Sequence, residues 1–209
     1  MSLRKEKAAR LKVQVLETTL KLIGRKSFGD LYVDDICDKV KISKVTLFKY
    51  FPQKEDILLY YFRAWCLARS VEFALKPREG LQGIYYLFDR LSDEFEEHPG
   101  LLLSLAGYLA DLNRSPKPFP IKPEEKRMFH PSIDGITNIE IMSIDQMLEK
   151  CILEAIFRKE ITKTISTRDI TNLINAVFVG GVVTAHVNQL SPPKNYFRKN
   201  IDLVVKGLG

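Results

Sequence analysis

The chain has 209 residues, which is enough for one or two domains with a buried core. Its 45% hydrophobic and 28% charged residues are typical of a globular protein and exclude a largely disordered one. No run of about eighteen apolar residues occurs, and no apolar run follows the basic N-terminus. We therefore expect no membrane span, no secretory signal and a cytoplasmic protein.

The net charge of +6 is concentrated in the first quarter of the chain. Residues 1–55 contain 13 Lys and Arg against 7 Asp and Glu, whereas residues 56–209 contain 19 of each. Such a distribution favours a polyanionic partner, because binding releases condensed counter-ions. Charge alone leaves open a second interpretation, a basic face that is merely solvated.

The three cysteines, Cys37, Cys66 and Cys151, lie far apart and form no Cys-x-x-Cys pair. An odd number without such spacing favours reduced thiols over a disulfide framework. Each has apolar neighbours, so we expect buried packing residues, with a redox-sensing thiol as the minor alternative.

The first fifty residues predict three helices from their apolar spacing, at 9–25, about 33–40 and 44–51. Gly29 lies in the break after the first helix. Ser43 is a good N-cap for the third helix, and Pro52 ends it. Leu47 and Phe51, four residues apart, should face inward. This is the pattern of a helix-turn-helix.

The remaining sequence predicts further helices at 54–75, 80–97, 99–113, 139–160, 167–189 and 194–207. Residues 114–123 contain four prolines and predict an extended loop, and residues 124–136 predict only a short, uncertain segment. No strand pattern competes. We therefore predict an all-α fold of about nine helices. We expect residues 1–53 to form a helix-turn-helix domain with a basic N-terminal arm, and residues 54–209 to form a helical ligand-sensing and dimerisation domain.

The third helix carries its cationic and aromatic side chains on the outside. Lysines can reach base edges or phosphates, Val and Thr can contact a thymine methyl, and hydroxyls can bind phosphate oxygens. Arg4, Lys5, Lys7 and Arg10 add backbone contacts from the N-terminal arm. We predict a DNA-binding surface that consists of Tyr32, Ser43, Lys44, Val45, Thr46, Phe48, Lys49, Tyr50 and Lys54.

The stretch 9–58 resembles the N-terminal domain of the TetR family of bacterial transcriptional regulators. Phe28, Val33 and Ile36 match the first half of the family pattern, and residues 43–55 (Ser-Lys-Val-Thr-Leu-Phe-Lys-Tyr-Phe-Pro-Gln-Lys-Glu) match most of the second. Four positions depart from it: Tyr32 replaces Thr, Lys41 and Val45 replace Gly, and Tyr50 replaces His. The Val45 departure points to an altered operator sequence.

The resemblance implies a ligand-responsive repressor that binds a palindromic operator as a homodimer and is released by a small hydrophobic effector. A dimer is also expected because one helix-turn-helix reads few bases. The apolar helix 167–189 and the helix after it should form the dimer surface, with burial inside one subunit as the alternative. We predict this surface at Leu173, Val177, Gly180, Gly181, Thr184, Asn188, Phe197 and Ile201.

An effector pocket should lie between helix 54–75, the 80–113 pair and helix 139–160. Its apolar and aromatic character suggests a hydrophobic ligand, with no cofactor and no metal. We predict a lining of Phe62, Cys66, Arg69, Tyr85, Phe88, Tyr108, Met147 and Cys151, each of which could instead be a core residue.

Two other classes of function compete with a DNA-binding regulator. An enzyme is disfavoured, because His98, His130 and His186 are scattered and no HExxH, GxSxG, P-loop or Rossmann glycine pattern occurs. An all-α small-molecule or lipid-binding module that has lost specific DNA reading would suit the departures from the family pattern. The positive charge on residues 1–55 speaks against it.

Overall fold

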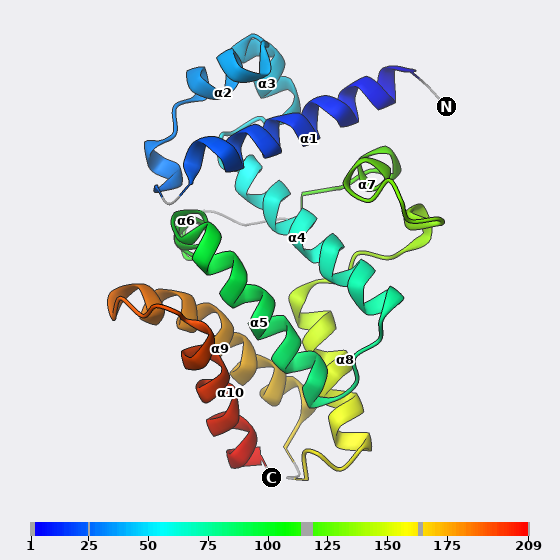
Figure 1. The fold of residues 1–209 in the computed structure, drawn as a ribbon, viewed down its shortest axis with the longest axis vertical. Coiled ribbons are helices and arrows are strands. Elements are labelled where there is room, and N and C mark those ends of the chain that lie inside the picture. The colour runs from blue at the N-terminus through cyan, green and yellow to red at the C-terminus, as the bar shows by residue number, and fades with distance from the viewer. Residues whose placement is uncertain (1–2, 25, 114–118, 163–164, 209) are drawn as a thin grey trace.

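The computed structural model describes residues 3–24, 26–113, 119–162 and 165–208, and every regular element among them is helical (Figure 1). The predicted all-α fold is confirmed, and the described residues form ten α-helices where about nine were expected. The elements are α1 (Leu3–Ile23), η1 (Phe28–Asp30), α2 (Val33–Val40), α3 (Lys44–Tyr50), α4 (Asp56–Leu75), α5 (Leu81–Glu97), α6 (Pro99–Leu109), α7 (Pro123–Phe129), η2 (Ile136–Asn138), α8 (Ile144–Phe157), α9 (Thr167–Val187) and α10 (Lys194–Leu208), where η denotes a 3-10 helix.

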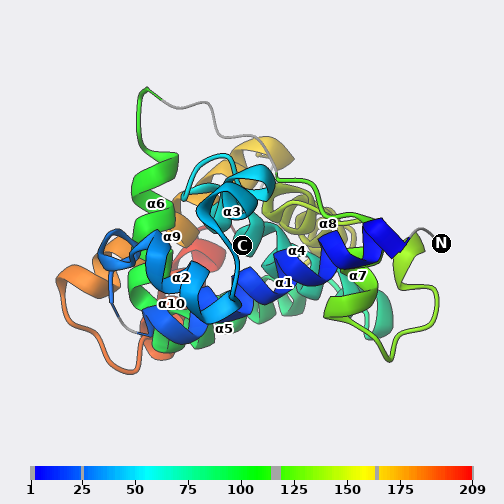
Figure 2. The same cartoon turned by 90° about the horizontal axis from the view of Figure 1, so that it is seen from above.

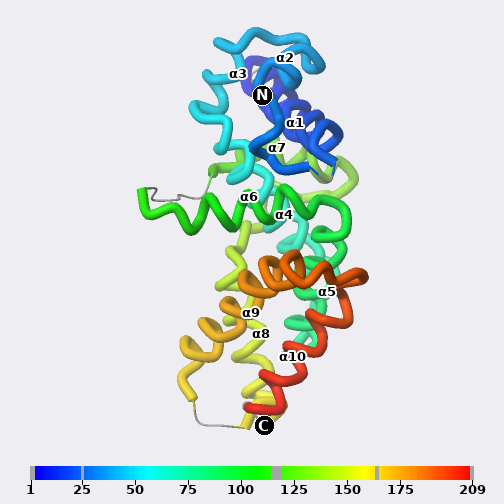
Figure 3. Tube along the Cα trace, turned by 90° about the vertical axis from the view of Figure 1, so that its left-hand side faces the viewer, coloured from blue at the N-terminus to red at the C-terminus, as the bar shows by residue number. Residues whose placement is uncertain are grey.

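The molecule is elongated, with α2 and α3 at one end and the C-terminus at the other (Figures 1 and 3). Helices α4 and α5 run along the long axis, whereas α6 crosses it. Viewed from the α3 end, α1 crosses the molecule beside α2 and α3 (Figure 2). The short helix α7 packs along the N-terminal half of α1.

One hydrophobic core runs through both of the predicted domains. It extends without a break from Val15 in α1 to Ile201 in α10. Across the predicted boundary at residues 53 and 54, the rings of Phe51 and Tyr60 lie edge to face with centroids 5.5 Å apart. The two-domain division therefore stays a prediction, and the two parts share packed side chains.

Several helix boundaries differ from those predicted. Helix α8 begins at Ile144 instead of 139, because Ser143 caps it: the Ser143 hydroxyl accepts from the Gln146 backbone, and the Gln146 side chain accepts from the Ser143 backbone. Pro123, which we expected to end a loop, is the first residue of α7, where proline's missing N–H costs no hydrogen bond. Residues 114–118 of the predicted loop lie outside the described residues.

The prediction that Phe197 and Ile201 lie on a dimer surface is wrong for this chain, because both are fully buried within it. Gly181, another predicted dimer residue, also makes its close contact within the chain. A Cβ atom at Gly181 would lie 2.6 Å from Cε1 of Phe197 in α10. At Gly180 the same atom would meet nothing within 4 Å. Gly181 therefore faces α10, whereas Gly180 faces solvent in one copy of the chain.

Helix α9 is long and apolar enough to pass a length-and-composition test for a membrane span. It packs against α6, α8 and α10, and its inward side chains include Ile174, Phe178 and Val182. No other helix among the described residues passes that test. A core helix with one exposed apolar face satisfies it equally well.

Candidate nucleic-acid interface and ligand cavity

The turn between α2 and α3 is built by one left-handed residue and one cap. Lys41 ends α2 with φ 60° and ψ 51°, the conformation that the family's usual glycine adopts without strain. Ser43 then begins α3, and its hydroxyl accepts a hydrogen bond from the Thr46 backbone at 3.2 Å. The chain thus tolerates a strained lysine at this turn, and Ser43 is the expected cap.

The inner face of α3 fixes the direction in which the helix points. Leu47 and Phe51 are each 1% exposed, as their spacing predicted, and they pack in the same core as the fully buried Ile36 of α2. With these two side chains held inside, the remaining residues of α3 are turned toward the outside.

The helix-turn-helix lies at one end of the molecule (Figure 1). Its outer face carries exposed apolar and cationic side chains. Tyr32 is 72% exposed, Val45 81% and Phe48 40%. Lys49 is also exposed, and Tyr50 is half-buried. A surface of this kind is costly in water unless a partner covers part of it.

Three of the predicted DNA contacts already have partners within the chain. The Nζ atom of Lys44 lies 2.8 Å from Oδ1 of Asp34, and this hydrogen bond raises the pKa of the exposed Lys44 amine. The Thr46 and Ser43 hydroxyls are 2.9 Å apart. DNA would have to compete with these contacts, which are exposed and therefore weak.

Lys54 points inward, although we predicted a phosphate contact for it. Its Nζ donates to the carbonyl oxygen of Phe28 at 2.7 Å and to that of Gly29 at 3.3 Å, and it lies 4.8 Å from the centre of the Phe28 ring. Partial burial lowers the pKa of this amine. Lys54 therefore ties the start of α4 to η1, and its contact with DNA stays a prediction.

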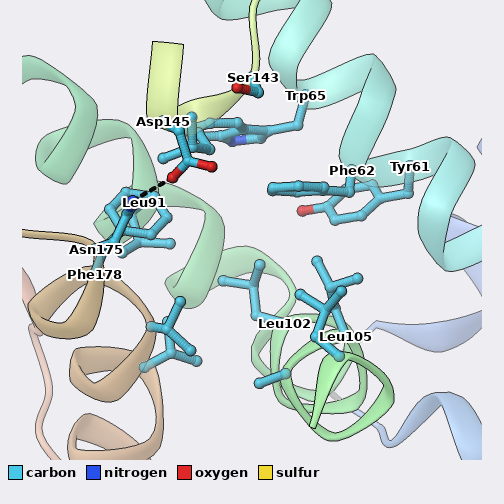
Figure 4. Close-up of a pocket in the computed structure, with 15 residues that line it drawn as sticks. Tyr61, Phe62, Trp65, Leu91, Leu102, Leu105, Ser143, Asp145, Asn175 and Phe178 are labelled. Carbon is cyan, nitrogen blue, oxygen red and sulfur yellow. Dashed lines mark hydrogen bonds between the residues drawn. The ribbon is translucent and has the colours of Figure 1, made fainter. Parts of the chain in front are cut away.

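An apolar cavity of about 350 Å³ lies between α4, α5, α6, α8 and α9 (Figure 4). This volume lies within the range of small-molecule sites. Aromatic residues of α4 and α9 form its walls, leucines of α6 close one side, and polar residues lie at its edge. The lining consists of Tyr61, Phe62, Trp65, Leu91, Leu102, Leu105, Ala106, Leu109, Ser143, Ile144, Asp145, Asn175, Phe178, Val179 and Val182.

The cavity contains few polar groups. The indole Nε1 of Trp65 is buried and has no hydrogen-bond partner among the described residues. At the edge of the cavity, the Asn175 amide donates to the Asp145 carboxylate (Figure 4). A buried donor without an acceptor is costly, and a ligand with an acceptor group would remove that cost.

Among the eight residues predicted to line a pocket, Phe62 lines this cavity and the other seven do not. Four are buried in the core elsewhere: Cys66, Phe88, Met147 and Cys151. The hydroxyl of Tyr85 donates to Asp202 in α10 at 2.6 Å, and Arg69 pairs with Glu72 and lies 5.0 Å from the Trp65 ring. Tyr108 is half-buried in α6. The prediction missed α9 as a wall because it gave that helix entirely to the dimer.

The other predicted dimer residues divide by the face of α9 on which they lie. Leu173, Gly180, Thr184 and Asn188 are exposed, and Val177 is half-buried. Val179, Val183 and Val187, which we did not predict, are exposed as well. The outer face of α9 is therefore apolar and uncovered in one copy of the chain.

Helix α6 connects the cavity with the helix-turn-helix. Leu102 and Leu105 line the cavity, while the Ser104 hydroxyl accepts a hydrogen bond from the Phe28 backbone at 3.2 Å. A Cβ atom at Gly100 would lie 1.9 Å from the Lys26 carbonyl oxygen, so glycine is required for α6 to approach this corner. Phe28 thus receives contacts from α6 on its N–H and from Lys54 on its carbonyl oxygen.

The N-terminal region matches a known protein family. Residues 15–61 match the model of the bacterial regulatory proteins of the tetR family. A segment of 52 residues is 40% identical to the HTH-type transcriptional regulator YuxN of Bacillus subtilis (strain 168), which is 23% of this chain and 18% of that protein.

The whole chain is similar in fold to solved regulators. It matches FadR from Bacillus subtilis, solved in complex with stearoyl-CoA, with a TM-score of 0.62 and 18% identity over 94% of this chain and 99% of that one. For the reduced form of Escherichia coli NemR the TM-score is 0.58, with 13% identity over 93% and 97% of the chains. A TetR transcriptional regulator from Rhodococcus sp. RHA1 gives 0.56, with 15% identity over 98% and 100%. The similarity to the tetR family is therefore one of sequence over residues 15–61, and the similarity to the solved regulators is one of fold over nearly the whole chain.

Proposed function

We propose that this protein is a cytoplasmic repressor that binds a palindromic operator as a homodimer and is released by a small apolar effector. The outer face of α3 carries the proposal: Val45, Phe48 and Lys49 are exposed on a helix whose opposite face is locked into the core. A side-chain set of this kind can read thymine methyls and phosphates in a major groove.

The outer face of α9 supports a homodimer. Leu173, Val179 and Val183 are between 45% and 48% exposed, and Val187 is 71% exposed, which is a large apolar stripe for a monomer. A second copy with the same face would cover it in a two-fold contact. Two recognition helices would then read the two halves of a palindrome.

Mass measurement by light scattering tests the dimer. We expect the wild-type protein to have the mass of two chains and Val183→Glu to have the mass of one, because a carboxylate cannot be buried unpaired in the contact. Leu75→Glu, which changes an exposed leucine at the end of α4, is the matched control and should leave the dimer intact. A wild-type protein that stays monomeric at high concentration would contradict the proposed assembly.

The cavity supports an apolar effector that carries a hydrogen-bond acceptor. Its walls are aromatic and aliphatic, and the Trp65 N–H has no hydrogen-bond partner in the described part of the chain. A long acyl chain fits these walls, and the similar fold of FadR was solved with stearoyl-CoA. A bound effector would displace α4 and α6. Ser104 of α6 and Lys54 before α4 both contact Phe28, next to the helix-turn-helix. The displacement would therefore change the spacing of the two recognition helices.

Release from DNA tests the effector. With a bound duplex in place, we would titrate dodecanoate and stearoyl-CoA and follow fluorescence anisotropy. Ala106→Phe fills the cavity and should abolish release, whereas Ala74→Phe, at an exposed position of α4, should not. The effector proposal fails if neither probe releases DNA or raises the unfolding temperature of the wild-type protein.

A further inference from the structure

A second hollow in the molecule lies directly beside the recognition helix. It is a groove of about 380 Å³ between the N-terminal half of α1, the end of α3 and the start of α7. Its lining combines basic side chains from all three elements: Arg4, Lys5, Ala8, Ala9, Lys12, Lys49, Tyr50, Lys122, Glu124 and Glu125. Two of these residues, Lys49 and Tyr50, belong to the predicted DNA-binding surface.

The accessible charge of this groove is positive. Arg4, Lys5, Lys49 and Lys122 are exposed, and none has an acidic partner within ion-pair distance among the described residues. Glu125 is buried and paired with Lys12, which leaves the half-buried Glu124 as the only other carboxylate of the lining. Four cations around one groove attract a polyanion.

The buried carboxylate of Glu125 fixes Lys122 at this place. Its Oε1 accepts from Nζ of Lys12 in α1 at 2.8 Å, and its Oε2 accepts from the backbone N–H of Lys122 at 3.2 Å. Nζ of Lys12 also lies 4.4 Å from the centre of the Tyr60 ring and 4.9 Å from that of Phe119. The buried ion pair of Lys12 and Glu125 therefore holds Lys122 next to α1. Lys122 follows α6 in the chain and lies outside the helix-turn-helix.

We propose that Lys122 joins Arg4, Lys5 and Lys49 in a phosphate-binding groove that holds the DNA backbone flanking the bases read by α3. This inference rests on the proposed operator binding. It extends the predicted DNA-binding surface to a segment of the predicted second domain, residues 54–209. The partner is duplex DNA and not a free anion, because the groove is open and is continuous with the recognition helix through Lys49 and Tyr50. Contacts of this kind position the protein on DNA and carry no base information.

The salt dependence of DNA affinity tests whether Lys122 contacts a phosphate. Each neutralised phosphate contributes about 0.9 to the slope of log affinity against log salt concentration. Because the proposed homodimer carries two copies of Lys122, Lys122→Ala should weaken binding at low salt and reduce the slope by about 1.8, with the order of preference among half-sites unchanged. The ratio of wild-type affinity to Lys122→Ala affinity should shrink about 12-fold between about 50 and about 200 mM salt.

The matched controls separate charge from folding. Lys122→Arg keeps the charge and should keep the wild-type slope, while Lys76→Ala removes an exposed lysine from the far end of α4 and should change nothing. The backbone N–H that bonds Glu125 remains in every Lys122 variant, so the fold should be retained. Circular dichroism and the unfolding temperature verify this.

The outcomes for Lys122 and Lys49 separate the inference from the function on which it rests. If Lys49→Ala weakens binding and flattens the slope while Lys122→Ala matches wild type, Lys122 does not contact DNA, so the inference fails and the operator proposal stands. If the wild-type protein itself shows no preference for any duplex, the proposed function fails first. A Lys122→Ala protein that changes half-site preference would also overturn the inference, since a phosphate contact cannot do so.

Discussion

Nζ of Lys12 lies 2.8 Å from Oε1 of Glu125, although the two residues are 113 positions apart. Both side chains are almost fully buried, at 8% and 2% exposed. Burial lowers the pKa of the Lys12 amine, and the hydrogen bond to Glu125 opposes that shift. The pair joins α1, which packs against α2 of the helix-turn-helix, to α7, which follows α6 in the chain.

Removing one partner of this pair should lower the free energy of unfolding more than replacing both partners. Lys12→Met leaves a buried carboxylate without its cation and should lower the free energy of unfolding by about 3–5 kcal/mol. Lys12→Met combined with Glu125→Leu should restore most of that loss, because similar apolar side chains replace the buried charges. Urea unfolding of the two variants and the wild type measures both values. A double variant no more stable than Lys12→Met would show that the pair does not behave as one buried unit.

Replacing the strained lysine at the helix-turn-helix should stabilise the protein. Lys41 has a positive φ, which costs a residue with a Cβ about 1 kcal/mol relative to glycine. Lys41→Gly should therefore raise the free energy of unfolding by up to about 1 kcal/mol. Lys39→Gly, two residues earlier on the exposed face of α2, is the control and should destabilise by about as much. Equal losses in both variants would argue against a left-handed Lys41.

The two neighbouring glycines of α9 should respond in opposite directions. Gly181→Ala places a methyl group 2.6 Å from the Phe197 ring and should destabilise the fold by about 1–3 kcal/mol. Gly180→Ala meets nothing within 4 Å in one chain and should gain up to about 1 kcal/mol in helix propensity. Thermal unfolding at a concentration that favours monomers compares them. Similar effects of the two changes would contradict the placement of Phe197.

The three thiols should be unreactive in the folded protein. Burial raises the pKa of Cys66 and Cys151 to about 12, and burial, with Asp34 and Asp38 nearby, also raises the pKa of Cys37. Because the thiolate is the reactive form, Ellman's reagent at about pH 8 should label none of them until denaturant is added. Rapid labelling of any one thiol in the native state would revive the redox-sensing alternative.

The stability that the contact between α5 and α10 contributes should decrease at acid pH. Partial burial opposes ionisation of Asp89, but hydrogen bonds from Arg198 at 2.6 and 2.8 Å hold the pKa of that carboxyl below its usual 3.8. A lowered pKa stabilises the fold above the ordinary value and stops doing so as the pH falls through the lowered one. Asp89→Asn should therefore cost about 1 kcal/mol at neutral pH. That loss should disappear as the pH falls from 3.8 toward the lowered value.

The matched control for this pH effect is Asp93→Asn. Its partner Arg90 is in the same helix, and both side chains are more exposed than Asp89. Unfolding followed at several pH values should show a small, nearly constant effect for Asp93→Asn. A cost of Asp89→Asn that persists at acid pH would mean that the charge of Asp89 is not what stabilises the contact.

The helix-turn-helix could be predicted from the sequence because its signals are local. The i, i+4 spacing of Leu47 and Phe51 and the capping by Ser43 are set within a few residues, and the structure confirms both. The left-handed Lys41 breaks the local rule, because that conformation favours the glycine that usually stands at this position.

Pairings between distant residues could not be predicted, because helical periodicity shows which face is buried and not what covers it. Phe197 was assigned to a dimer, whereas it packs on Gly181 of its own chain. Lys54 was predicted to contact DNA, and the bond of its amine to the Phe28 carbonyl oxygen was not foreseen. No local pattern in the sequence indicates the pairing of Lys12 with Glu125. Glu125 lies in α7, where only a short, uncertain segment was predicted.

The most direct test of operator binding is the selection of bound duplexes from a random pool by the full chain, followed by sequencing. We predict enrichment of a palindrome with two equal half-sites, each read by one α3 helix. Val45→Ala should relax the half-site preference, because the exposed Val45 can contact a thymine methyl. No enrichment over random duplex, from a protein shown to be folded and dimeric, would contradict the account and leave the apolar cavity as the basis for its function.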